Sequence, residues 1–511
     1  MSISSPLPPD DARFEALERA LVEQFRTIFP DRRASRTVVV IPSLSFDAQV
    51  LAKIKGVQHY EERMLCMLML LRMPRTRVIY VTSQPVPQPV VDYYLHLLPG
   101  VPSSHARRRL TMLACYDGSI TPVADKILAR PRLVERIRRE IRDPARTHMN
   151  CFTATMSERA LALRLGIPLY ATDPTRSDLG SKSGSREVFR AAGAPLADGF
   201  ERLHDMDEVA EALTELGQRH PDLSRAVVKL EEGASGEGNA VFSYLGRPQG
   251  QGLRAWIDAE LPARLAFEAS NETWDEYSAK FREMGGIVEA WVEGRDKRSP
   301  SVQCRIDPLG GTEIISTHDQ ILGGPSGQVF LGSTFPADDA YRLDIQAIGL
   351  DVANLLRDRG ALGRFGVDFV SVAKPDGTWE HYAIEVNLRK GGTTHTYMML
   401  QFLTDGRYRV DTGLFETLTG QHRYYYASDN ITNPDYCRLT PGDVIDIAVD
   451  VGLHFHGATQ QGVVFHLIGA VSEFGKLGVL CVGDSPERAR ELYDHTVATL
   501  DREALDDDVH R

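Results

Sequence analysis

The chain has 511 residues, which is enough for about three compact units of the usual size of ~100–200 residues. Apolar residues make up 42% of it and charged residues 25%, and this composition excludes a disordered chain. The formal net charge of −12 disfavours binding of nucleic acid or an anionic membrane by the surface as a whole. Any phosphate that the protein handles must therefore be held by local groups.

Neither a membrane span nor an export signal is predicted. The most apolar run, residues 64–71, is much shorter than the ~18 residues that a span needs. The polar N-terminus lacks the basic and apolar regions of a secretory signal. The six cysteines stand far apart without a CxxC pair, so we expect reduced thiols and a cytoplasmic location.

The first unit, residues 1–175, alternates strand-like and helix-like patterns. Strands are expected at 37–42, 77–82 and 167–172, and helical stretches at 60–72 and 158–165. This alternation is typical of a parallel sheet with helical crossovers.

The second unit, residues 176–404, is predicted to be α+β with many antiparallel strands. It opens with a polar loop leading into a helix at 178–189, followed by a hairpin at 226–244. Further strands are expected at 286–292, 301–306, 312–316, 365–372 and 381–386, with a helix at 344–359.

The third unit, residues 405–511, is predicted to be a small α/β cap with strands at 462–469 and 478–482 and a helix at 486–500. His454 and His456 share a strand face and could bind a metal ion. No third ligand is identifiable by spacing, so an ordinary face of the cap is the preferred interpretation.

Two strands near residues 363–387 carry the strongest chemical signal. If these strands are neighbours, Asp368 and Glu385 can face one side, and Asn387 lies on the same face as Glu385. Such oxygen ligands suit Mg²⁺, which keeps waters and substrate phosphates in its shell. The alternative is a pair of carboxylates on a solvated sheet face, but both have apolar neighbours, and an unpaired buried carboxylate is costly.

A lysine followed by a glycine-rich loop forms a second signal. Lys229 ends a strand and can reach a phosphate, while Gly233, Gly236 and Gly238 allow backbone N–H groups to approach phosphate oxygens. Taken alone, this segment is more often a flexible hairpin, and it matches no standard phosphate-binding motif.

The segment 287–296 forms a third signal. As a strand leading into a turn, it can present the backbone of Glu289 to Val292 to a purine edge and Asp296 to sugar hydroxyls. From this segment alone, the edge of a strand followed by a charged turn is the better interpretation.

Together, these segments resemble the ATP-grasp superfamily over residues 178–395. The resemblance implies a parallel pre-ATP-grasp domain, two α+β subdomains that clasp ATP, and a small C-terminal α/β cap. It implies that ATP is bound by the residues Lys182, Lys229, Gly233, Ser235, Gly236, Gly238, Glu289, Ala290, Val292 and Asp296. It also implies that Asp368, Glu385 and Asn387 bind Mg²⁺, with Mn²⁺ as a substitute.

A closer resemblance is to the pheganomycin-type peptide ligases, and GVDFV, AIEVNLRKGGTTHT and STHDQILGGPSGQVFLGSTFPA carry it. The C-terminal string GKLGVLCVGDSPERARELYDH matches less closely. Ala290 is a departure, because several ATP-grasp enzymes have lysine there. Only its backbone is needed for adenine, so ATP use is still expected.

The resemblance implies a ligase that activates a carboxylate as an acyl-phosphate and joins it to the amine of an amino acid or peptide, releasing ADP and phosphate. Arg389, Arg305 and Lys390 are the candidate catalytic residues, and His318, Gln320 and His395 the candidate substrate contacts. A homodimer is also considered. The alternatives are acyl transfer to the thiol of an acyl-carrier protein and a non-catalytic nucleotide-binding protein.

Overall fold

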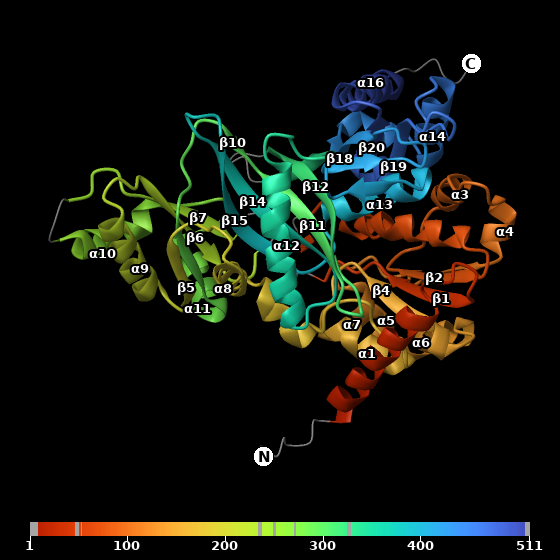
Figure 1. Ribbon diagram of the computed structural model, residues 1–511, viewed down its shortest axis with the longest axis horizontal. Coiled ribbons are helices and arrows are strands. Elements are labelled where there is room, and N and C mark those ends of the chain that lie inside the picture. Colours follow the sequence, from red (N-terminus) through yellow and green to blue (C-terminus); the bar gives the residue numbers. More distant parts are fainter. Residues whose placement is uncertain are drawn as a thin grey trace.

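The computed structural model describes residues 9–45, 51–52, 54–233, 238–248, 252–269, 272–323 and 329–505. Figure 1 shows a parallel α/β unit, a small antiparallel unit on the opposite side and a large sheet between them. Among the described residues, no helix is both long and apolar enough to cross a membrane.

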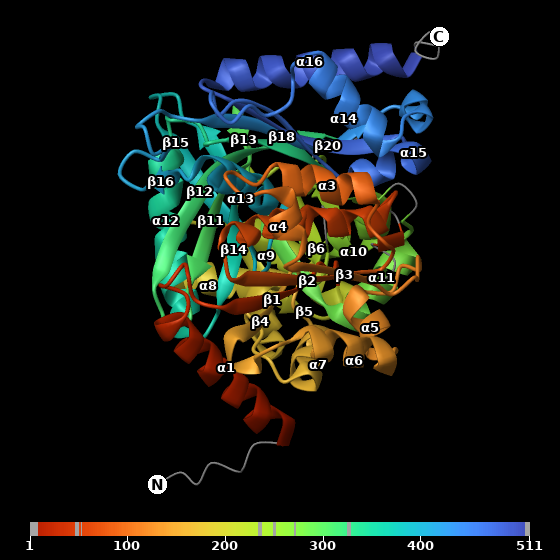
Figure 2. The same ribbon diagram turned by 90° about the vertical axis from the view of Figure 1, so that its right-hand side faces the viewer.

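The N-terminal unit is built on a parallel sheet in the order β3-β2-β1-β4. Its strands are β1 (Arg36–Ile41), β2 (Thr76–Thr82), β3 (Leu110–Ala114) and β4 (Thr147–Cys151). Its helices are α1 (Pro9–Thr27), η1 (Val57–Arg72), α3 (Gln88–His96), α4 (Ser103–Arg107), α5 (Val123–Leu128), α6 (Pro131–Glu140), η2 (Pro144–Arg146) and α7 (Met156–Leu165). Figure 2 shows helices on both faces of this sheet.

The sequence of β1 explains why both faces are covered. Val38 and Val40 belong to one apolar cluster, and Val39 and Ile41 belong to another, because successive side chains point to opposite faces. A strand that is apolar at every position is typical of a parallel sheet buried on both sides. The strand expected at 167–172 is reduced to a single bridge, in which Leu169 pairs with Met149 beside β4.

The small antiparallel sheet has the order β5-β9-β6-β7-β8. Its strands are β5 (Gly199–Leu203), β6 (Arg225–Leu230), β7 (Asn239–Ser243), β8 (Leu265–Phe267) and β9 (Gly286–Ala290). The accompanying helices are η3 (Pro174–Gly180), α8 (Lys182–Ala192), α9 (Met206–Arg219), α10 (Leu253–Arg264) and α11 (Trp274–Met284). The predicted hairpin is formed by β6 and β7, in which Lys229 pairs with Asn239.

The large sheet has nine strands in the order β10-β14-β11-β12-β13-β18-β20-β19, with β15 also paired to β14. Its strands are β10 (Lys297–Arg298), β11 (Pro300–Ile306), β12 (Thr312–Gly323), β13 (Val329–Phe335), β14 (Gly363–Ala373), β15 (Trp379–Asn387), β18 (Tyr424–Thr432), β19 (Gly462–His466) and β20 (Lys476–Gly483). The remaining elements are α12 (Arg342–Asp358), α13 (Gly392–Thr404), β16 (Arg407–Arg409), β17 (Leu414–Glu416), η4 (Pro434–Arg438), α14 (Pro441–Asp450), η5 (Ile468–Ala470), α15 (Val471–Phe474) and α16 (Pro486–Leu505).

The C-terminal region continues this large sheet, since β13 pairs with β18 and β18 pairs with β20. It also contacts the N-terminal unit, where the Tyr94 hydroxyl donates a hydrogen bond to the Phe465 carbonyl at 3.2 Å. The C-terminal strands therefore contact both of the other parts of the chain. The unit boundaries expected from the sequence, at residues 175 and 404, stay predictions.

Candidate active site

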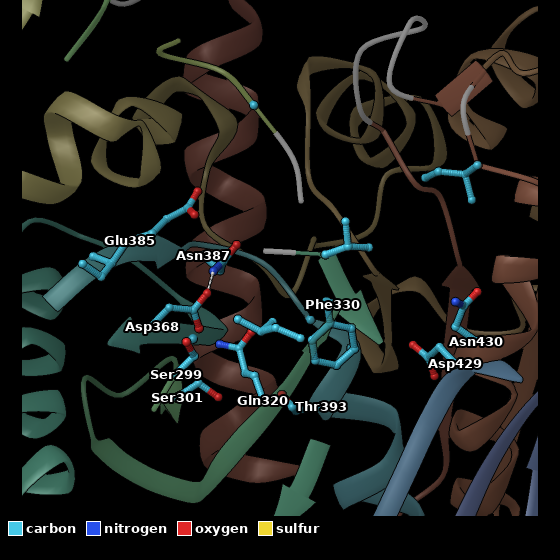
Figure 3. Close-up of a pocket in the computed structure, with 18 of the residues that line it drawn as sticks. Ser299, Ser301, Gln320, Phe330, Asp368, Glu385, Asn387, Thr393, Asp429 and Asn430 are labelled. Atoms are coloured by element: carbon cyan, nitrogen blue, oxygen red, sulfur yellow. Dashed lines mark hydrogen bonds between the residues drawn. The ribbon is translucent and has the colours of Figure 1, made fainter. Parts of the chain in front are cut away.

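A cavity of about 1530 Å³ lies where the parts of the molecule meet. The small sheet contributes Lys229 and Glu289, the large sheet contributes Asp368 and Glu385, and η1 contributes Arg63. Figure 3 shows Asp368, Glu385 and Asn387 together on neighbouring strands, with Ser299, Ser301 and Gln320 beside them. Large clefts between structural units are common binding sites for small molecules.

The paired carboxylates lie side by side because β14 and β15 are antiparallel and in register. Asp368 is the partner of Glu385 in this register, and Asn387 Nδ2 donates a hydrogen bond to Asp368 Oδ2 at 2.7 Å. Burial, together with the nearby charge of Glu385, raises the pKa of Asp368 to about 7. Two carboxylates held this close in a buried site need a cation.

These side chains fit a bound Mg²⁺ ion. Asp368 and Glu385 offer carboxylate oxygens, and the Asn387 carboxamide offers a further oxygen while its Nδ2 is engaged. Burial is the main cause of the raised pKa of Asp368, and a divalent cation bound here would stabilise the charged form of this carboxyl.

Lys182 connects the small unit to this cluster. It begins α8, where Ser181 caps the helix by accepting from the Gly184 N–H, and its Nζ lies 2.5 Å from Glu385 Oε1. The Ser183 N–H donates to Glu231 Oε1 at 2.7 Å, which anchors the start of the glycine-rich loop at the same helix end. A phosphate group that entered here would find Lys182 beside the loop.

Lys229 takes part in a buried ionic group. Its Nζ lies 2.5 Å from Glu289 Oε1, and Arg186 Nη1 lies 2.8 Å from Glu289 Oε2. These two cations lower the pKa of the Glu289 carboxyl against the effect of burial. The side chain of Glu289 is therefore a partner of two cations, while its backbone belongs to the expected adenine-binding segment.

The expected adenine-binding segment follows β9 along the cavity wall. Ala290 and Val292 line the cavity, and the Val292 carbonyl accepts a hydrogen bond from Lys297 Nζ at 2.7 Å. Lys297 also lies over the ring of Trp291, with Nζ 4.6 Å from its centroid. Asp296, the expected ribose contact, is instead paired with Arg298 at 3.2 Å and is not among the lining residues.

Arg389 lines the cavity just beyond the carboxylates. Burial lowers the pKa of its guanidinium, and the charges of Glu385 and Asp368 oppose that effect. Its Nη1 donates a hydrogen bond to the Lys390 carbonyl at 3.1 Å. The arginine is thus placed to meet a carboxylate or phosphoryl group beside the metal ligands.

Two expected catalytic residues lie elsewhere. Arg305 Nη2 pairs with Glu313 at 2.5 Å, and Arg305 stands four residues from Ser301, the partner of Asp368, or about 13 Å along the strand. Lys390 Nζ donates to the Cys151 carbonyl at 2.5 Å, so it is turned into the N-terminal unit. Neither residue lines the cavity.

The remaining candidates divide between the cavity and the core. Gly233 and Gln320 line the cavity, whereas the Gly238 carbonyl accepts from the Tyr277 hydroxyl at 3.1 Å. His318 is fully buried, with Nε2 2.7 Å from the Tyr425 hydroxyl, and does not contact the cavity. Ser235 and Gly236 lie outside the described residues.

The structure also shows where the remaining histidines singled out in the sequence lie. His395 is buried and lies 3.4 Å from Asp429, away from the cavity surface. His454 and His456 are exposed and form isolated bridges with Val463 and Gln461. An exposed edge agrees with the preferred interpretation of His454 and His456.

The sequence analysis missed several lining residues. Arg63 and Asp429 form a close ion pair with 2.5 Å between Nη2 and Oδ2, although 366 residues separate them in the chain. The run of charged residues at 295–298 is a sequence signal that could have pointed to Lys297. No sequence pattern links Arg63 to Asp429, because their contact depends on how the first and last thirds of the chain pack.

Comparison with solved structures gives the class of fold. The chain resembles a biotin carboxylase from Campylobacter jejuni with a TM-score of 0.54 and 12% identity, covering 93% of this chain and 96% of that one. It also resembles the biotin carboxylase domain dimer of a Hydrogenobacter thermophilus 2-oxoglutarate carboxylase, solved with MgADP, with a TM-score of 0.53 and 13% identity over 93% and 94% of the two chains. This is the ATP-grasp fold, as the sequence predicted.

Comparison of sequences is more specific. An L-propargylglycine–L-glutamate ligase from Streptantibioticus cattleyicolor is 30% identical over 89% of this chain and 92% of its own length. Residues 255–411 match the family model "IQCH-like, ATP-grasp", and residues 443–496 match "PGM1 C-terminal domain". The IQ motif-containing protein H of Danio rerio is 25% identical over 75% of this chain, which spans 40% of that protein.

The chain belongs to the pheganomycin-type ligases of the ATP-grasp superfamily. It is an ATP-dependent, ADP-forming ligase that joins a carboxylate to an amine in an amide bond. The family, the fold and the class of reaction predicted from the sequence are thereby confirmed.

Proposed function

We propose that this ligase joins the carboxylate of one amino acid to the amine of a second amino acid or a peptide. The observation that carries the proposal is that one cavity holds the paired carboxylates Asp368 and Glu385 together with Lys182 and Arg389. The S. cattleyicolor relative, whose name specifies two amino acids, supports this choice of substrates.

In the proposed arrangement, the small unit binds the nucleotide. Lys182 and Lys229 exchange their present carboxylate partners for phosphate oxygens, since both already lie in the cavity wall. The backbone of the segment 289–292 contacts adenine, and Glu231 keeps the loop near α8. Asp296 can contact the ribose only after its ion pair with Arg298 breaks.

Asp368, Glu385 and Asn387 hold Mg²⁺, which supplies charge neutralisation between ATP phosphates during phosphoryl transfer. A carboxylate oxygen of the first substrate attacks the γ-phosphorus, and ADP leaves. The amine nitrogen of the second substrate then attacks the carbonyl carbon, phosphate leaves, and a proton is lost from nitrogen. Arg389 stabilises the negative charge that develops on the carbonyl oxygen in this second step.

The test is a screen for ADP release with Mg²⁺-ATP over single L-amino acids and their pairwise mixtures, followed by mass identification of the products. The expected result is ADP formation that needs both an acid and an amine, with a product lighter than the two substrates by one water. Amine-independent activation that yields only a thioester on a carrier protein would contradict the proposal.

The same preparation tests two further proposals, the use of Mn²⁺ and the formation of a homodimer. Replacing Mg²⁺ by Mn²⁺ in the assay tests the first. Light scattering gives the molecular mass and tests the second, which is proposed because the H. thermophilus neighbour was solved as a dimer. Localisation of the tagged chain in its host tests the cytoplasmic placement.

A further inference from the structure

A second group of side chains that could hold a metal ion lies just behind the cavity wall, and Asp429 is its one member that lines the cavity. His395 on α13, Asp429 on β18 and His466 at the end of β19 bring their ligand atoms within 4.8 Å of one another. All three are buried, with exposed fractions of 3%, 4% and 3%. Figure 3 shows Asp429 well apart from Asp368 and Glu385, so this group is separate from the expected Mg²⁺ site.

Asp429 is the centre of the group. Its Oδ1 lies 2.5 Å from His466 Nε2 and 3.4 Å from His395 Nε2, and its Oδ2 accepts from Arg63 Nη2 at 2.5 Å. The two imidazole rings lie 4.5 Å apart and nearly perpendicular, at 75°. Both imidazoles therefore converge on one carboxylate oxygen, while the arginine holds the other.

His395 is the unusual member. Neither of its ring nitrogens makes a hydrogen bond within the described part of the chain, although the side chain is almost fully buried. An unsatisfied buried polar atom costs about 1–3 kcal/mol, and such atoms commonly mark a bound water or ion.

We propose that His395, Asp429 and His466 bind a divalent transition-metal ion of the Zn²⁺ type. Two imidazole nitrogens and one carboxylate oxygen suit zinc, whereas the all-oxygen group around Asp368 suits Mg²⁺. Three protein ligands leave a further position for water or a substrate group. Asp429 lines the cavity and His395 and His466 do not, so the ion would lie just behind the cavity wall.

The distances permit this with a small rearrangement. Ligand atoms about 2.0–2.1 Å from a tetrahedral zinc ion lie about 3.3 Å apart. The contact from His395 already has this length, and the contact from His466 must lengthen by somewhat less than 1 Å. For its Nε2 to bind the ion, His466 must be in the tautomer that carries its proton on Nδ1. Arg63 keeps its contact with Oδ2 and fixes the carboxylate plane.

The test uses the full chain, stripped with a chelator and then titrated with ZnCl₂ against a chromophoric chelator, with CoCl₂ as a spectroscopic probe. We expect one Zn²⁺ per chain and a visible Co²⁺ absorption band. His395→Gln and His466→Gln are each expected to weaken Zn²⁺ binding at least 10-fold. His318→Gln, which alters another buried histidine outside the group, is the matched control and keeps full binding.

The proposal is overturned if the wild-type chain binds no Zn²⁺ above the level of the control metal MgCl₂ and shows no Co²⁺ band. The three side chains then form only a hydrogen-bonded group around Asp429. Equal Zn²⁺ affinity in His395→Gln and wild type also overturns it. Should a variant fail to fold, the presence or absence of the Co²⁺ band in the wild type decides. Ligase activity is not used in any arm, so the result is independent of the proposed function.

Discussion

At the scale of single residues, the proposed chemistry depends most on the paired carboxylates. Asp368 and Glu385 are in register on adjacent strands, and Lys182 forms an ion pair with Glu385. Replacing Glu385 by glutamine keeps its shape but removes the charge that the metal ion needs. We expect Glu385→Gln to lower kcat by at least about 100-fold, the effect seen when one group that stabilises transition-state charge is lost.

The measurement is ADP release at saturating substrates, with Glu313→Gln as the control. Glu313 pairs with Arg305 outside the cavity, so its replacement is expected to change kcat less than about 2-fold. Loss of this exposed ion pair should lower the free energy of unfolding by only about 0–1 kcal/mol. Equal losses in both variants would show that the effect is one of folding rather than of metal binding.

A different carboxyl group makes stability depend on pH. Burial raises the pKa of Glu61 to about 7, although the Ser83 N–H donates to its Oε2 at 2.6 Å. The folded state therefore binds more protons than the unfolded state between pH 4.5 and 7, so stability falls as pH rises through this range, by up to about 1.4 kcal/mol per pH unit.

Glu61→Gln removes this titration. We expect the melting temperature of the wild type, relative to this variant, to fall between pH 5 and pH 8. Differential scanning calorimetry at four pH values measures the difference, and a constant or rising difference would contradict the pKa of Glu61.

Strand alternation made the shared face of the proposed metal ligands predictable but not their surroundings. The period of two places Glu385 and Asn387 on one face, and the structure brings both to Asp368. Lys390 was predicted from its position directly after the carboxylate strand, and Arg305 from its place on the strand at 301–306. Each instead has a partner supplied by tertiary packing, the Cys151 carbonyl for Lys390 and Glu313 for Arg305. Such partners have no local signal.

At the scale of elements, α8 joins the two sheets. Arg186 on this helix contacts Glu289, Glu201 and the Ala197 carbonyl at 2.8, 2.6 and 2.9 Å, and its side chain is 2% exposed. Arg186→Met removes one of the two cations that neutralise buried Glu289. Breaking a buried ion pair costs about 3–5 kcal/mol, so a clear drop in melting temperature is expected.

Arg190→Met, one turn further along α8, is the matched control. Arg190 is exposed and also pairs with Glu201, at 2.6 Å, so its loss should cost about 1 kcal/mol or less. Comparable destabilisation in the two variants would contradict a structural role for the buried group around Glu289.

Some helices and strands were predicted correctly from the sequence, and others differ in the structure. The hairpin of β6 and β7 and the strands β14 and β15 follow directly from apolar runs that end in glycine or charged turns. The helical stretch at 60–72 is a 3₁₀ helix, and the strand at 167–172 is one bridge. These differences depend on packing against β2 and β4, which local patterns do not encode.

At the scale of the whole molecule, the cavity has walls from the first, middle and last parts of the chain. The first and last parts meet in the pair of Arg63 and Asp429, and helix α8 meets the large sheet in the pair of Lys182 and Glu385. The net charge of −12 describes the entire surface, whereas Lys182, Lys229 and Arg389 place positive charge where phosphate would bind. Charge at the site is thus opposite to charge overall.

The central claim is that the chain activates a carboxylate as an acyl-phosphate before the amine attacks. It is tested most directly with an acid substrate in which both carboxylate oxygens are ¹⁸O. One labelled oxygen must then pass to the γ-phosphorus and leave in inorganic phosphate, so mass spectrometry should find one ¹⁸O per phosphate for each amide formed. Unlabelled phosphate, or label that appears in AMP, would contradict the account.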